Sequence, residues 1–115
     1  AKELKPDEKS FNLFLAKSLY HSKQKELRQE SIKLLWSYIK DDDFPYDAWH
    51  YLGLNYGKLK KHDYSSYALA EKYLLVNELN NAKIHIQRAK RISNDPVLIN
   101  KISDLEKEII KRESK

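Results

Sequence analysis

The 115-residue chain carries 22 Lys and Arg against 17 Asp and Glu, a net charge of +5, with 2 Gly, 3 Pro and no Cys. Without cysteine it has neither disulfides nor thiolate metal ligands, and no run approaches the roughly 18 apolar residues that a membrane span needs. The length predicts one domain, and 41% hydrophobic with 34% charged residues and so little Gly and Pro favours helices.

The period of the apolar residues predicts six helices, and the first three lie in the N-terminal half. The first runs over about 7–20 and the second over about 27–40. Pro45 opens the third, because proline is tolerated in a first turn, where its missing N–H costs nothing. That helix carries Trp49, Leu52 and Tyr56 at spacings of three and four, which is typical of one buried face.

Three further helices follow in the C-terminal half. We expect Asp63 to cap the fourth, and Asp95-Pro96 to open the sixth. The fifth covers about 80–92, and no alternating, strand-like pattern occurs. The inward-facing residues of the last two helices are Ala82, Ile86 and Ala89 in the fifth, and Leu98, Ile102, Leu105 and Ile109 in the sixth. The fold class is therefore all-α.

The third and fourth helices repeat one frame. The third reads Trp49-x-x-Leu52-Gly53-x-x-Tyr56, and the fourth reads Ser66-x-x-Leu69-Ala70-x-x-Tyr73. This frame resembles the first helix of a tetratricopeptide (TPR) unit, in which a small residue lets the neighbouring helix approach closely. The resemblance implies antiparallel helix pairs in a right-handed solenoid, with Asn77 in a left-handed turn between helices.

The spacing of the two frames departs from a regular repeat. Leu52 and Leu69 lie 17 positions apart, half of the 34-residue TPR period. Either the superhelix breaks here, or the fourth helix serves one repeat as second helix and the next as first. We therefore divide the single domain, 1–115, into a repeat at 7–44, a half unit at 46–62, a repeat at 63–96 and a capping helix at 96–112.

No catalytic or metal-binding motif is visible. His21, His50, His62 and His85 are scattered and do not form the HExxH pattern of zinc peptidases, and the acidic run 41–43 lacks the ligand spacing of a calcium loop. We expect neither catalysis nor a cofactor in this chain.

A partner-binding groove is expected on the inner face of the solenoid, on first-helix positions beside the packing residues. An apolar and basic groove suits an extended or helical peptide that carries acidic groups. The residues are Leu13, Lys17 and Tyr20 on the first helix, His50, Leu54 and Lys58 on the third and, if the fourth helix joins the inner layer, Tyr67, Glu71 and Leu74.

Two stretches are similar to the C-terminal TPR tail of periplasmic zinc metalloproteases: 47–59, DAWHYLGLNYGKL, and 68–73, ALAEKY. The chain has no Met and begins at Ala1, so we interpret it as a fragment or processed product. The resemblance implies a gluzincin-type peptidase domain N-terminal to this chain, which would hold the only zinc. It also implies a periplasmic location and a role in outer-membrane protein quality control. None of that family's zinc ligands, nor its catalytic Glu, matches a position here.

The sequence thus predicts a protein-interaction module whose partners are the parent peptidase domain or outer-membrane assembly components. A free-standing cytoplasmic TPR adaptor is the alternative, and residues upstream of Ala1 separate the two. A nucleic-acid-binding helical repeat is a third hypothesis, prompted by the charge of +5. Acidic residues interleave with the basic ones, as in Glu26-Leu27-Arg28-Gln29-Glu30, which disfavours nucleic acid.

Overall fold

The computed structural model describes residues 25–114, which form five helices and no strand. The helices are α2 (Lys25–Asp41), α3 (Tyr46–Lys58), α4 (His62–Leu75), α5 (Leu79–Ile92) and α6 (Pro96–Glu113). They confirm the all-α class over this part of the chain. The first predicted helix, at 7–20, lies outside the described residues.

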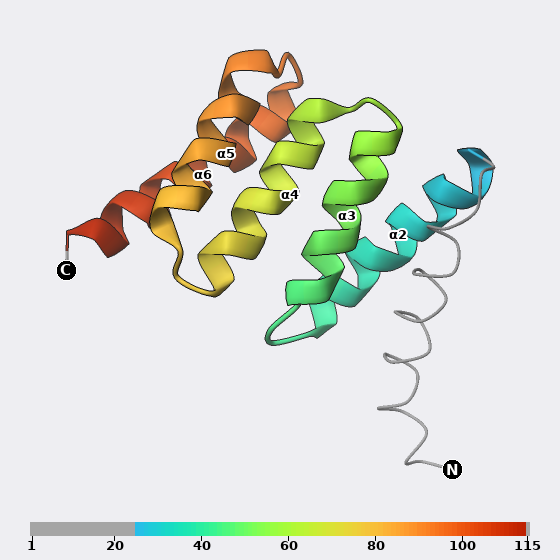
Figure 1. Cartoon of the computed structure of the whole chain (residues 1–115), viewed down its shortest axis with the longest axis horizontal. Helices are drawn as coiled ribbons and strands as arrows, with labels where there is room; N and C mark the ends of the chain where they lie inside the picture. Colours follow the sequence, from blue (N-terminus) through green and yellow to red (C-terminus); the bar gives the residue numbers. More distant parts are fainter. Residues whose placement is uncertain (1–24, 115) are drawn as a thin grey trace, which may run out of the picture.

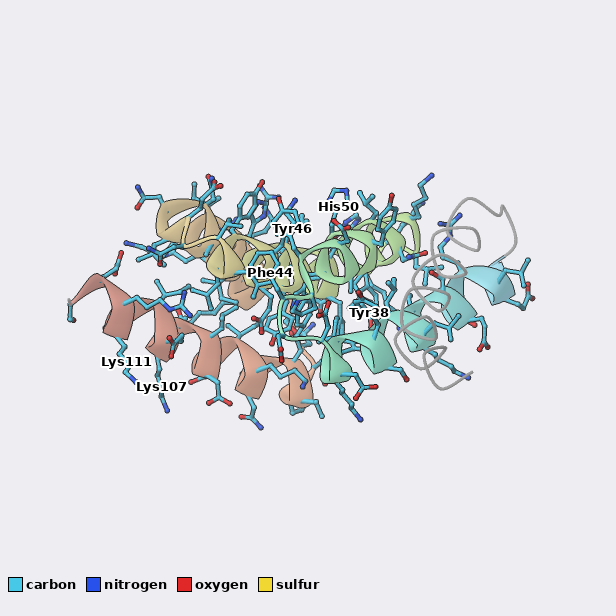
Figure 2. The ribbon with its side chains drawn as sticks, turned by 90° about the horizontal axis from the view of Figure 1, so that it is seen from below. Tyr38, Phe44, Tyr46, His50, Lys107 and Lys111 are labelled. Atoms are coloured by element: carbon cyan, nitrogen blue, oxygen red, sulfur yellow. The ribbon has the colours of Figure 1, made fainter. Side chains whose placement is uncertain are left out.

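The helices form two layers. α3, α4 and α5 lie side by side with α4 in the middle, and α2 and α6 lie on the same side of this layer, at its two ends (Figures 1 and 2). Consecutive helices pack against each other and α6 also contacts α4, whereas the backbones of α3 and α5 do not come close. A regular helix-pair solenoid alternates successive helices between its layers, so the half-unit step coincides with a break in that alternation. The right-handed solenoid stays a prediction.

Aromatic rings fill the core where α2, α3 and α4 meet. The ring of Trp49 meets Trp36 edge-on at 5.3 Å between centroids, and Tyr67 edge-on at 5.9 Å. The indole N–H of Trp36 donates to the hydroxyl of Tyr56 over 2.9 Å, which satisfies two polar groups that burial would otherwise leave unpaired. Trp49 and Tyr56 are therefore core residues, as their spacing predicts.

A small residue lets α3 and α4 approach closely. A Cβ built on Gly53 would lie 2.9 Å from Cδ2 of Leu69, closer than carbon atoms pack. The hydroxyl of Ser65 donates to the Gly53 carbonyl over 2.8 Å, which fixes the pair at this distance. Gly53 and Leu69 belong to the two repeated frames, so both frames serve one interface.

The apolar stripes of α5 and α6 are buried as their spacing predicts. The buried residues are Ala82, Ile86 and Ala89 of α5, and Leu98, Ile102, Leu105 and Ile109 of α6. No helix in residues 25–114 is long and apolar enough to cross a membrane.

The helix ends follow the predictions at two places and depart from them at a third. Asn77 adopts φ 58, the left-handed conformation expected of it. Asp95 accepts a hydrogen bond from the Val97 N–H over 2.9 Å and Pro96 occupies the first turn of α6. Asp63 is not the cap of α4: that helix begins one residue earlier, at His62, after Lys61, and has no side-chain cap.

Candidate protein-binding surface

The predicted groove residues of α3 form one stripe. His50 and Leu54 are half-buried and Lys58, the last residue of the helix, is exposed. Their spacing of four places them along one face, and Figure 2 shows His50 on the side of the α3–α4–α5 layer that faces away from α2 and α6. Leu13, Lys17 and Tyr20, the groove residues predicted on the first helix, lie outside the described residues.

Tyr67 and Glu71 do not join this stripe. Tyr67 is 6% exposed, and its hydroxyl donates to the Glu71 carboxylate. The charge of Asp104 on α6 acts on Tyr67, and the charge of Lys101 on α6 acts on Glu71. This corrects the prediction that they line the same groove as His50: α4 turns them toward α6 and the core. Leu74, at 7% exposure, is likewise a core residue.

A cluster around Lys72 occupies the outward side of the layer instead. Its ammonium lies 3.3 Å from Nδ1 of His50, 4.8 Å from the ring centroid of Tyr73 and 5.8 Å from that of Tyr46. The ring of His85 stacks on Tyr73, with centroids 5.4 Å apart. We call Tyr46, His50, Lys72, Tyr73 and His85 the Lys72 cluster; α3, α4 and α5 each contribute to it.

The electrostatics of this cluster are unusual because its cation is buried without an acid. Lys72 is only 8% exposed. Among residues 25–114, no carboxylate lies within ion-pair distance of its ammonium. Its charge is held by the lone pair of His50 and by the faces of two aromatic rings, both of which attract cations.

The two histidines are kept neutral by their surroundings. Burial, and then the charge of Lys72, lower the pKa of His50, while Asp47 acts weakly in the opposite direction. Burial lowers the pKa of His85 as well, followed by the charges of Arg88 and Lys72. Within the described part of the chain, Nδ1 of His85 is buried without a hydrogen-bond partner. The surroundings of both imidazoles therefore favour the neutral form.

An exposed aromatic residue borders the cluster. Phe44, in the loop before α3, is 54% exposed and its ring stacks on that of Tyr46 with centroids 6.2 Å apart. Exposed or half-exposed aromatic side chains are typical of protein-binding surfaces, because they bury a large area at little entropic cost. The surface thus combines an apolar edge with a basic centre.

A hollow lies between α5 and α6. It has a volume of about 100 Å³ and is bridged by the ion pair of Lys83 with Glu113, 2.8 Å apart. Ile86 and Ile109 form its floor and the exposed Ile110 its edge. It is small and holds no cluster of reactive groups.

The described residues show no metal-binding group. Among residues 25–114, no three His, Asp or Glu side chains converge in a way that would hold a metal ion. The Lys72 cluster combines a positive charge, hydrogen-bonding capacity and aromatic surface, which are features of protein-binding surfaces.

The sequence pattern found only one member of this cluster, His50. The repeated frame predicts Tyr73 as a packing residue. Nothing in the sequence pattern predicts that Lys72 and His85 belong to a binding site, because 22 and 13 positions separate Lys72 from its partners on α3 and α5. Only the side-by-side packing of three helices brings them together.

Comparisons with protein-family models, with curated proteins and with solved structures find no match.

Proposed function

We propose that this chain is a protein-interaction module and that its partner docks on the outward side of the α3–α4–α5 layer. One observation carries the proposal: three helices place half-buried aromatic and imidazole side chains around the Lys72 ammonium, which has no ion-pair partner among residues 25–114, beside an exposed Phe44. Aromatic residues that are partly buried before binding lose little freedom when a partner covers them, so they make strong anchors.

The test is selection of ligands from a random-peptide library displayed on phage, with the whole 115-residue chain as bait. Selected peptides are expected to shift NMR signals of α3, α4 and α5. The variant Tyr46→Ala is expected to bind the selected peptides about tenfold more weakly, which is the loss expected for a moderate hot spot.

The control is Lys107→Glu on α6, which lies on the opposite side of the molecule (Figure 2). It reverses a surface charge without touching the proposed site, so binding should stay unchanged. Peptides that bind Tyr46→Ala and Lys107→Glu equally well, or that shift only NMR signals of α6, would place the binding surface elsewhere.

For the full protein we propose a periplasmic zinc metalloprotease acting in outer-membrane protein quality control, of which this chain would be the C-terminal TPR tail. The resemblance of 47–59 and 68–73 to such tails supports this, and zinc would belong to the preceding peptidase domain. The upstream coding sequence tests it: we expect a signal peptide and an HExxH motif. An upstream sequence with neither would favour the cytoplasmic adaptor.

A further inference from the structure

We infer that Lys72 anchors a side-chain carboxylate, from an Asp or Glu of the bound protein, between His50 and His85. The inference rests on the proposed function, since it names what the α3–α4–α5 surface recognises. The ligand is an acidic side chain within a partner segment, and the burial and the neighbours of Lys72 point to it.

The ammonium of Lys72 lacks a counter-charge among residues 25–114. A buried ammonium is costly unless an opposite charge or strong hydrogen bonds compensate for its lost hydration. Lys72 is 8% exposed, and two rings and one imidazole are its partners within the described residues. A lysine donates three hydrogen bonds, and His50 accepts only one. The ammonium therefore retains the capacity to bind an anion.

The acid next to Lys72 in the chain, Glu71, points away from the Lys72 ammonium. Glu71 precedes Lys72 in the chain, yet its carboxylate accepts a hydrogen bond from the hydroxyl of Tyr67 and is affected by the charge of Lys101 of α6. Successive residues of a helix point about 100° apart, so Glu71 cannot serve Lys72 without breaking this contact. Asp47 is close enough to act on His50, but not to pair with Lys72.

The imidazoles of the Lys72 cluster also favour an anionic ligand. Because Nδ1 of His50 accepts from Lys72, the ring proton of neutral His50 lies on Nε2, where it is a donor. Burial is the main cause of the lowered pKa of His50 and His85, and a carboxylate at the ammonium would cancel the further lowering by the charge of Lys72. Arg88, which acts on His85, adds a second positive charge on α5. An anionic group fits these neighbours, whereas a cationic one would meet only repulsion.

The experiment uses two small probes that differ only at the acid: N-acetyl-glutamate amide and N-acetyl-glutamine amide. Each is titrated into the full chain while the ring carbon-bound protons of His50 and His85 are followed by NMR. The glutamate probe should shift both rings saturably and raise both pKa values, and the glutamine probe should do neither. The wild-type chain suffices for this comparison.

The variant Lys72→Met keeps an unbranched side chain of similar length and removes the charge. Saturable binding of the glutamate probe should be lost. The control is Lys107→Met, which removes an exposed lysine of α6 on the opposite side of the molecule (Figure 2). This control should bind the probe as the wild type does.

Equal shifts with both probes, or unchanged binding in Lys72→Met, would overturn the inference. Peptide selection tests the proposed function separately. Selected peptides that depend on Tyr46 but tolerate replacement of every acidic residue by its amide would leave the binding surface in place and remove Lys72 as its anchor.

Discussion

Trp49 shows how much stability one side chain contributes to this small core. It is 7% exposed and contacts the rings of Trp36 and Tyr67 edge-on. Trp49→Ala removes both contacts and leaves a cavity that the helices fill only in part. We expect a loss of about 3–5 kcal/mol in the free energy of unfolding.

Urea denaturation followed by circular dichroism measures this loss. The control is Phe44→Ala, an aromatic truncation at a side chain that is 54% exposed, which should cost far less. Equal losses for the two variants would show that Trp49 is not the centre of the core.

The histidines of the Lys72 cluster make stability depend on pH. Because their pKa values are lowered in the folded chain, the unfolded chain binds protons more readily. Their contribution is therefore complete above the ordinary histidine pKa of about 6.5 and declines as pH falls below it. In Lys72→Met one cause of the lowering disappears, so the NMR pKa of both rings should rise and the decline should become shallower. Titration curves identical to those of the wild type would contradict this.

Within the single helix α3, replacing either of two glycines by alanine is expected to change stability in opposite directions. Gly57→Ala adds a Cβ whose nearest neighbour is Oγ of Ser65 at 3.5 Å, an ordinary contact. Alanine favours a helix over glycine by about 1 kcal/mol, so this variant should be more stable than the wild type.

Gly53→Ala gains the same propensity but forces Leu69 away from its position 2.9 Å from the new Cβ. Crowding a packed interface costs about 1–3 kcal/mol, so this variant should be less stable than Gly57→Ala by a similar amount. Thermal or urea denaturation of the pair decides. Gly53→Ala as stable as Gly57→Ala would mean that α3 and α4 tolerate a wider separation.

The helix ends show which local signals reach the folded state. Asp95 and Pro96 act together, one as acceptor and one as first-turn residue, and α6 begins where they predict. Asp63 has a side chain that could cap a helix, but α4 already begins at His62. The Asp63 carboxylate instead accepts a hydrogen bond from the N–H of the next residue, Tyr64. Capping preference is worth about 1 kcal/mol, less than the packing of α4 against both its neighbours.

At the scale of the whole molecule, α6 tests whether the helices unfold together. Ile109 is 2% exposed near the far end of α6, whereas both tryptophans lie on α2 and α3. Ile109→Ala should cost about 2–5 kcal/mol. If the domain is cooperative, urea transitions followed by tryptophan fluorescence and by circular dichroism should shift together.

The adjacent Ile110→Ala is the matched control, because that side chain is 61% exposed and should change stability by less than about 0.5 kcal/mol. Fluorescence that keeps its wild-type midpoint in Ile109→Ala would mean that α6 unfolds alone.

The sequence alone predicts the all-α class, the positions of all five described helices to within a few residues, and the buried faces of α5 and α6. These follow from local rules: apolar residues recur every three or four positions, Pro fixes its own φ, and Asn tolerates the left-handed conformation of a turn. Such rules act within one helix, so the chain order carries them in full.

The layer that α4 joins and the place of the candidate site depend on packing between helices. Leu69 repeats the frame of Leu52, but which layer α4 joins depends on packing between helices. That packing turns Tyr67 and Glu71 inward and brings His50, Lys72 and His85 together from three helices. No periodicity relates residues on different helices, because their approach is set by side-chain volume at the interfaces, as Gly53 against Leu69 shows.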